Sequence, residues 1–150
     1  MTLATLGEDG PWAAPVIYAW ETHSSEVFLY FMSRLSTRHV QNLLKAPRVA
    51  AAIHPNETRP LRGLQVDGTV ELLRGKEALR VIRFYLRRIP SARTRFPIRA
   101  VVQEKSDIRF FRFLLERVFI LSEEHFGWGN RYLLELPTGT VSQTTGWESQ

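Results

Sequence analysis

The sequence predicts a mainly β domain, a barrel of mostly antiparallel strands with flanking helices. Short apolar or β-branched segments recur along the chain, and turn residues separate them. Five of these segments precede the clearest helical segment, and about two follow it. Because closely spaced strands must avoid exposed edges, closure into a barrel is the expected arrangement.

Turn residues and short loops divide the predicted strands. Gly7–Pro11 and Glu21–Glu26 carry turn chemistry, and loops this short favour antiparallel hairpins. Gly63 and Gly68, inside the fifth strand, indicate bulges or a close approach of backbones. Ile108–Leu121 is strongly apolar, and only its last part is predicted as a strand. The predicted strands are Thr2–Leu6, Trp12–Trp20, Val27–Met32, Arg48–His54, Leu61–Leu73, Arg117–Leu121 and Arg131–Leu136.

Two helices are predicted between the strands. Ser36 and Thr37 are N-cap residues for a helix that reaches Lys45, before Pro47. Lys76–Arg88 has an apolar stripe on one face and arginines on the other, which is typical of a helix packed against a core. The segment 91–105 is ambiguous and is consistent with a further short helix, and 125–130 is predicted as a loop.

Size, composition and charge narrow the class of protein. With 150 residues and 44% hydrophobic residues, the chain fits one domain with a real core. No stretch approaches the roughly 18 apolar residues of a membrane span, and the first residues lack a signal-peptide pattern. A cytoplasmic protein without membrane attachment is therefore expected. The absence of cysteine excludes disulfides and thiolate-held metals, and the net charge of +5 favours anionic ligands.

The most informative segment is Phe31–Leu43, where a strand ends and a helix begins within a few residues. Its turn is rich in hydroxyl groups and cations. A helix N-terminus offers unpaired N–H groups and a partial positive charge, and arginine fits phosphate oxygens, so the combination is typical of a phosphate site. The alternative is an ordinary helix cap with solvated arginines.

Several short motifs occur in an order that resembles a known family. They are Leu3-Ala4-Thr5-Leu6, Asp9-Gly10-Pro11, Ala14-Pro15-Val16-Ile17-Tyr18, Val27-Phe28-Leu29-Tyr30-Phe31, Thr37-Arg38-His39, Asn42-Leu43, Pro47-Arg48-Val49-Ala50, Gln65-Val66-Asp67-Gly68, Arg117-Val118-Phe119-Ile120 and Phe126-Gly127-Trp128-Gly129. Over roughly residues 2–136 the chain resembles the pyridoxamine 5′-phosphate oxidase-like superfamily of FMN-binding split barrels. The likeness is to its small, poorly characterised bacterial members. It implies an FMN-binding split-barrel domain over 1–136, with 137–150 as a polar tail.

The resemblance also implies a homodimer with FMN at its interface. The strand-to-helix turn would hold the flavin phosphate, with Arg38 as the main cation because His39 stands where members commonly have lysine. The strand at Pro15 would run along the flavin ring, and the Trp128 loop would approach the flavin or the partner subunit. The expected cofactor-binding residues are Pro15, Val16, Ile17, Tyr18, Phe31, Met32, Ser33, Thr37, Arg38, His39, Gln65 and Trp128.

The expected function is flavin-dependent oxidoreduction of an unknown small molecule, because the cofactor itself carries such chemistry. No catalytic side chain is assigned. The oxidase motif that grips pyridoxal phosphate is matched only loosely around Tyr85, Arg87, Arg88 and Ser91, and its C-terminal arginine–histidine motif is not visible. Oxidation of pyridoxamine phosphate itself is therefore not expected.

Other functions remain open at this stage. A non-catalytic flavin-binding protein, a deazaflavin protein, or a haem-binding or haem-handling protein on the same fold would share these motifs, with His54 or His125 as a haem ligand. No histidine pair has the spacing of a helical metal site, so no metal is expected. The arginine run from Arg80 to Arg99 is interpreted as a solvated helix face. A grip on an anionic ligand is its first alternative, and a basic nucleic-acid-binding module, which would bind polyanions in a salt-dependent way, is the least expected one.

Overall fold

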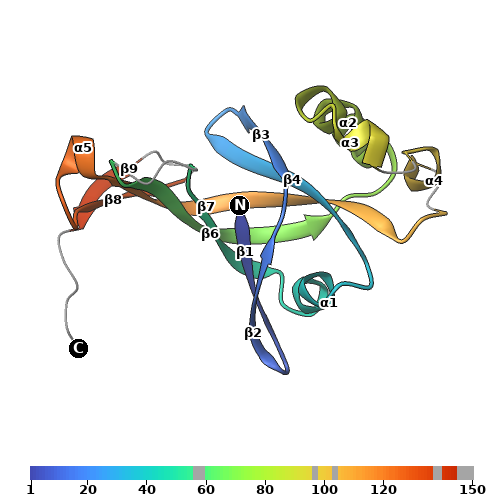
Figure 1. The fold of residues 1–150 in the computed structure, drawn as a ribbon, viewed down its shortest axis with the longest axis horizontal. Helices are drawn as coiled ribbons and strands as arrows, with labels where there is room; N and C mark the ends of the chain where they lie inside the picture. Colours follow the sequence, from blue (N-terminus) through green and yellow to red (C-terminus); the bar gives the residue numbers. More distant parts are fainter. Residues whose placement is uncertain (56–59, 96–97, 103–104, 137–139, 145–150) are drawn as a thin grey trace.

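The computed structural model describes residues 1–55, 60–95, 98–102, 105–136 and 140–144. Its strands form one strongly curved sheet in the order β2-β1-β5-β6-β7-β4-β3, with β8 and β9 continuing from β7 (Figure 1). All pairings are antiparallel, which confirms the predicted mainly β fold class. The strands are β1 Thr2–Gly7, β2 Gly10–Pro15, β3 Tyr18–His23, β4 Glu26–Arg34, β5 Arg48–Ile53, β6 Arg62–Leu72, β7 Ile108–Ser122, β8 Arg131–Glu135 and β9 Thr140–Thr144.

Five helices accompany the sheet in the described part of the chain. They are α1 Arg38–Lys45, α2 Gly75–Arg88, α3 Ala92–Arg95, α4 Ile98–Val102 and α5 Glu123–Phe126. The two predicted helices are confirmed, and the ambiguous segment 91–105 contains α3 and α4. In Figure 1, α2, α3 and α4 gather on one side of the sheet, and α5 lies at its opposite end. None of these helices is long and apolar enough to span a membrane.

The prediction of one strand over Trp12–Trp20 was wrong. The segment forms β2 and β3, which belong to opposite ends of the sheet order, with Val16 and Ile17 between them. Pro15, the last residue of β2, has no N–H to extend the ladder with β1. The chain therefore leaves β1 and crosses to pair with β4.

β7 is much longer than predicted. It runs for fifteen residues and pairs with β4 and β6 and then with β8. Only its last part was predicted as a strand, because its apolar residues do not alternate cleanly. The reason is that β7 is covered on both faces, and such a strand loses the period-two pattern.

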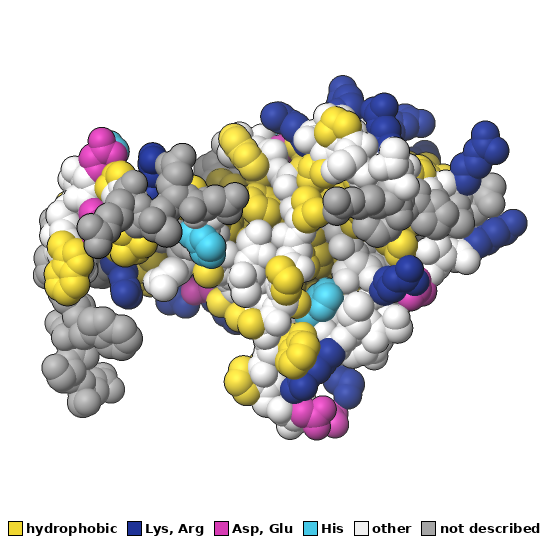
Figure 2. All heavy atoms as spheres, viewed as in Figure 1, with side chains coloured by type: hydrophobic (Ala, Val, Ile, Leu, Met, Phe, Trp, Pro, Cys, Tyr) yellow, Lys and Arg dark blue, Asp and Glu magenta, His cyan; other side chains and the backbone are white. Residues whose placement is uncertain are grey.

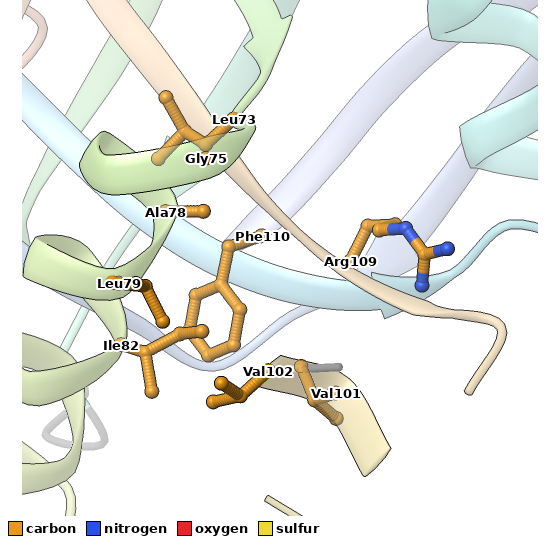
Figure 3. A pocket seen from close by; sticks show the side chains of 9 residues that line it. All are labelled: Leu73, Gly75, Ala78, Leu79, Ile82, Val101, Val102, Arg109 and Phe110. Carbon is orange, nitrogen blue, oxygen red and sulfur yellow. The ribbon is translucent and has the colours of Figure 1, made fainter. Parts of the chain in front are cut away.

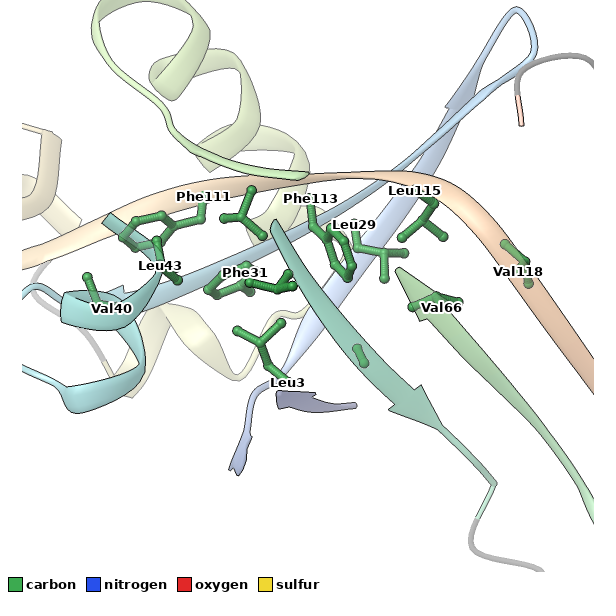
Figure 4. Packing of buried hydrophobic residues seen from close by; sticks show 13 residues of the cluster. Leu3, Leu29, Phe31, Val40, Leu43, Val66, Phe111, Phe113, Leu115 and Val118 are labelled. Carbon is green, nitrogen blue, oxygen red and sulfur yellow. The ribbon is translucent and has the colours of Figure 1, made fainter. Parts of the chain in front are cut away.

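Two apolar clusters lie on the two faces of the sheet. The first fills its concave side and includes Phe31 and Phe111, whose rings stack at 5.2 Å (Figure 4). The second lies between the sheet and the helices α2 and α4, where Tyr85 meets the edge of the Phe110 ring at 5.3 Å. The second cluster fixes the position of α2, which matters for the site.

Gly68 marks a β-bulge, as the glycine pattern predicted. The register between β6 and β7 shifts at Asp67 and Gly68. A Cβ atom at Gly68 would lie 2.0 Å from the carbonyl oxygen of Leu114. Only glycine permits this approach, which bends the long strands across the middle of the sheet.

The C-terminal region differs from the sequence prediction in two places. Residues 123–126 of the region after β7 form the short helix α5, so the predicted loop 125–130 begins inside a helix. Within the predicted polar tail, Thr140–Thr144 form β9 against β8. The rest of that tail, 137–139 and 145–150, lies outside the described residues.

Candidate functional site

Three polar side chains meet at the turn between β4 and α1. The Ser33 hydroxyl oxygen lies 2.8 Å from His39 Nε2 and 3.3 Å from the Thr37 hydroxyl oxygen. The distance from Thr37 Oγ1 to His39 Nε2 is 3.4 Å. Ser33 is the second-last residue of β4, whose inner residues are core, and His39 lies in the first turn of α1. The turn therefore builds the hydroxyl–imidazole cluster predicted for anion binding, which we call the turn cluster (Ser33, Thr37 and His39).

The first turn of α1 keeps its backbone donors available. Thr37 is the N-cap residue, but its side chain makes no capping hydrogen bond. Its hydroxyl instead donates to the carbonyl oxygen of Arg34, at 2.8 Å. Because the first N–H groups of a helix have no partner within the helix, an anion beside the turn cluster would meet both hydroxyl groups and backbone donors.

The turn cluster borders a cavity of about 160 Å³. Ser33 and His39 contribute polar atoms, and α2 and the start of α3 close the opposite side with apolar groups. Part of its wall is backbone of the crossing between β2 and β3. The lining residues are Pro15, Val16, Ile17, Met32, Ser33, His39, Tyr85, Ile89, Ser91 and Ala92.

The crossing at Val16 and Ile17 is held in place by backbone bonds. The amide of Val16 donates to the Met1 carbonyl oxygen at 2.9 Å, and the N-terminal amine donates to the Val16 carbonyl oxygen at 3.1 Å. The Tyr85 hydroxyl donates to the Ile17 carbonyl oxygen at 3.0 Å. The Ile17 N–H has no such acceptor within the described chain, so it is available to a ligand beside this exposed residue.

Burial sets the protonation states at this cavity. It lowers the pKa of His39, because a charged imidazole there loses its hydration. Burial also raises the pKa of Tyr85 to about 12. Near neutral pH the cavity therefore presents a neutral imidazole and a protonated phenol, and an anion would be held by hydrogen bonds rather than by a permanent charge.

Arg38 points away from the cavity. Its guanidinium group lies 4.5 Å from the centre of the Trp12 ring and donates to the Asp9 carbonyl oxygen at 3.1 Å. Arg34, the other cation of the turn, pairs with Asp107 at 3.0 Å. The family resemblance predicts that Arg38 binds the flavin phosphate, whereas in the structure Arg38 contacts the hairpin between β1 and β2.

The remaining predicted residues are not gathered with the turn cluster. Phe31 is fully buried in the first core cluster, and Tyr18 pairs with it across β3 and β4. Gln65 is exposed on β6, opposite Ala52 of β5. Trp128 is 87% exposed beyond α5, at the other end of the sheet. Six of the twelve predicted residues thus line the cavity, and Thr37 joins them through the turn cluster.

The sequence prediction did not assign four lining residues to the cofactor site: Tyr85, Ile89, Ser91 and Ala92. The loose match around Tyr85 and Ser91 was the available signal. Periodicity alone placed Tyr85 in the core stripe of α2, because a buried aromatic side chain with one polar end looks the same in a sequence whether or not it borders a cavity.

Two further cavities have a different character. One of about 300 Å³ adjoins the same crossing and is lined by Pro15, Val16, Ile17, Met1, Thr2, Ala52 and His54. Another, of about 110 Å³, lies between α2, α4 and β7 (Figure 3). Its lining is apolar apart from Arg109, whose guanidinium donates to the carbonyl oxygens of Ser106 and Ile108. Only the first adjoins the turn cluster's cavity and can extend it.

Comparisons with known proteins identify the family and the fold of the chain. A family model described as pyridoxamine 5′-phosphate oxidase matches residues 1–121. UPF0306 protein YhbP of Salmonella paratyphi C is 33% identical over 84 residues, which cover 55% of this chain and 56% of that protein. The chain thus matches little more than half the length of this curated relative.

Solved structures show the same fold. A haem-binding protein from Mycobacterium smegmatis has a TM-score of 0.62 at 24% identity, covering 96% of this chain and 51% of that one. A pyridoxamine 5′-phosphate oxidase-related, FMN-binding protein from Nostoc punctiforme has a TM-score of 0.62 at 14% identity, covering 95% and 84%. These likenesses confirm the expected split-barrel fold, and they include both FMN-binding and haem-binding proteins.

Proposed function

Because the chain belongs to the pyridoxamine 5′-phosphate oxidase family, we propose that it binds FMN and acts as a flavin-dependent oxidoreductase on a small molecule. The observation that carries this proposal is the meeting of the turn cluster and the Ile17 N–H at one cavity. The turn cluster suits the phosphate of FMN, and the Ile17 N–H suits a hydrogen-bond acceptor on the edge of the flavin ring. Bound FMN would supply the hydride or electron transfer.

The residues present fit the two ends of FMN. Ser33 can donate its hydroxyl hydrogen to a phosphate oxygen, together with the first N–H groups of α1. Thr37 can do the same if its hydroxyl leaves the carbonyl oxygen of Arg34. Met32, Ile89 and Ala92 offer apolar surface to a flat ring. Tyr85 holds α2 against the crossing through its bond to Ile17, so it fixes the width of the space in which the ring would lie.

The cavity in one chain is too small to enclose such a ligand. Ligand sites usually measure roughly 300–1,000 Å³, whereas this cavity measures about 160 Å³. A second copy of the chain would complete the wall. We therefore include a homodimer, with the cofactor at its interface, in the proposal.

The outer face of β1, β2 and β5 supports this homodimer. Antiparallel sheets normally turn charged or polar residues to water. Here the only exposed charge is Arg48 at the start of β5, which pairs with Glu116 at 2.9 Å. The other exposed positions of this face are small or apolar: Thr2, Ala4, Leu6, Pro11, Ala13, Pro15, Ala50 and Ala52. We call this surface the alanine face. Its small, uncharged side chains suit close packing against a second copy, and it ends beside the 300 Å³ cavity at Pro15 and Ala52.

The test is an absorbance spectrum of the concentrated protein, before and after FMN is added and unbound ligand is removed. Retained flavin bands are expected, together with a Kd that rises about 10-fold or more in Ser33→Ala, the size of a lost hydrogen bond to a charged group. Bleaching by NAD(P)H would identify an oxidoreductase. Bound flavin that no donor reduces would identify a flavin-binding protein, and no retained flavin would contradict the proposal.

Haem binding is a second candidate, favoured by His54 at the adjoining 300 Å³ cavity and by the fold shared with a haem-binding protein. An exposed imidazole beside an open space is a suitable axial ligand. Haem titration would give a Soret band that is lost in His54→Ala. His125 is the control, because it does not line that cavity.

A further inference from the structure

The positive charge of this chain is concentrated in the helical layer of α2, α3 and α4. Residues 75–102 contain eight lysine and arginine residues and one acid, Glu77. The rest of the chain contains twelve bases and fourteen acids, so it is slightly negative. The net charge of +5 therefore comes from this helical layer. In Figure 2, dark-blue lysine and arginine side chains gather over the upper edge of the molecule.

The basic side chains of residues 75–102 that the structure describes are exposed, and few of them have partners. Arg80 pairs with Glu21 at 2.9 Å, and Arg88 lies over the Phe84 ring at 5.6 Å. No acid among the described residues pairs with the other exposed bases of the layer, which are Lys76, Arg83, Arg87, Arg93 and Arg99. By contrast, Arg48, Arg112 and Arg117 of the sheet are all ion-paired. We call the unpaired five the basic layer.

The spacing within α2 turns its bases to one side. Lys76, Arg80, Arg83 and Arg87 follow one another by four, three and four residues, which keeps them on one helix face. At 1.5 Å of rise per residue this row is about 16 Å long. Like charges so close together cost stability, and the ion pair between Arg80 and Glu21 offsets only part of that cost. Such a row is suited to a ligand with regularly repeated negative charges.

We infer that the basic layer binds the phosphate backbone of double-stranded nucleic acid without reading its sequence. Arginine, which outnumbers lysine here, fits phosphate oxygens with its planar fork. A duplex carries one charge per roughly 1.7 Å, so a row of this length meets several phosphates. The row of bases on α2 faces away from the cavity, which uses Tyr85 on the buried side of α2 and Ile89 just beyond its end, so this inference does not depend on FMN.

The surface fits a duplex better than two other polyanions. Single strands are held by stacking on exposed aromatic rings, but Phe84 is half-buried beneath Arg88. An amphipathic membrane-binding helix adds inserted apolar side chains to its attraction for anionic lipids, and the exposed large ones described in the layer are only Leu79 and Val102. Backbone contact alone therefore matches the available groups.

The test is fluorescence anisotropy with a short labelled duplex DNA of mixed sequence, at about 50 to 200 mM salt. Binding is expected at the lower salt concentration and is expected to weaken steeply as salt rises. The double variant Arg83→Gln/Arg87→Gln should weaken binding at least tenfold and reduce the logarithmic salt slope by about 2, since each lost phosphate contact removes about 0.9. Both side chains are exposed, so an unchanged melting temperature is expected to confirm folding.

A matched variant separates the basic layer from overall charge. Arg34→Gln/Lys45→Gln removes the same charge from residues that pair with Asp107 and Glu8, and its affinity should change less than twofold. The inference is overturned by absent duplex binding at low salt, by equal losses in both variants, or by a preference for phosphatidylserine vesicles or for single strands over the duplex.

Discussion

The two ends of the sheet present their polar side chains differently. At the turn between β4 and α1, Ser33, Thr37 and His39 bond to one another beside a cavity. At the opposite end, Ser122 pairs with His125, and Trp128 stands 87% exposed beyond α5 (Figure 1). A single chain thus holds Ser33, Thr37 and His39 together beside a cavity, whereas the Trp128 side chain at the other end faces outward. The difference indicates which part of the proposed site a single chain builds and which part depends on assembly.

The largest effect is expected when a charge is placed on the alanine face, because this tests whether FMN binding depends on the homodimer. Ala4→Glu should convert the dimer to a monomer, because an unpaired charge buried in an interface costs about 3–5 kcal/mol. FMN affinity should fall at least 100-fold. Light scattering after gel filtration and a flavin titration measure the two changes. Leu44→Glu, an exposed site on α1 outside this face, should remain dimeric.

Substitution at the bulge tests the bend between the two ends. Gly68→Ala places a Cβ atom against the Leu114 carbonyl oxygen, so the backbone of β6 or β7 must move. The free energy of unfolding should fall by about 2–4 kcal/mol, as for other steric conflicts in a core. Urea denaturation measures it. Gly10→Ala is the comparison: its Cβ would meet no atom within 4 Å, although its φ of +90° adds some strain, and it should cost less.

Substitutions of Ser33 and Arg38 test which of these two side chains contributes more to phosphate binding. Ser33→Ala should weaken FMN binding by about 1.5–3 kcal/mol, whereas Arg38→Ala should cost less than about 1 kcal/mol, because its guanidinium faces Trp12. The family resemblance alone predicts the opposite order. Isothermal titration of both variants decides between them, and a larger loss in Arg38→Ala would show that this side chain swings to the ligand.

A pH series tests the buried imidazole. The pKa of His39 is lowered in the folded protein, so the unfolded chain takes up this proton first as pH falls. The free energy of unfolding should therefore decline as pH drops below about 6.5, the ordinary histidine value, and level off below the folded value. Urea titrations at about pH 7.5 and about pH 5.5 measure the decline. In His39→Gln this part of the decline should disappear.

The smallest effect is expected at the far end. Trp128→Ala should leave the free energy of unfolding within about 0.5 kcal/mol of the unsubstituted protein, because the side chain is almost fully exposed. Urea denaturation checks this. A larger loss would show that the assembled protein buries the loop, and a flavin titration of the same variant would then locate that contact relative to the cofactor.

Local patterns in the sequence predicted most elements, and the family resemblance named six of the ten residues that line the cavity. The Ser33–His39 turn was found because strand end, hydroxyl groups and helix start lie within seven residues. Tyr85 was not assigned to the site, since its bond to Ile17 joins residues 68 positions apart. The break at Pro15 was missed for a similar reason: only the pairing of β2 with β1 and of β3 with β4 divides that segment.

By itself, the sequence determined the antiparallel strands, the two main helices, the bulge at Gly68 and the family, because each depends on neighbouring residues or on short motifs in order. Only the tertiary structure decided the direction of Arg38, the full length of β7 and the concentration of unpaired charge over α2. These depend on which side chains meet across the sheet. The Arg38 guanidinium group contacts the Trp12 ring and the Asp9 carbonyl oxygen because folding brings them beside it, and residue spacing along the chain does not specify these contacts.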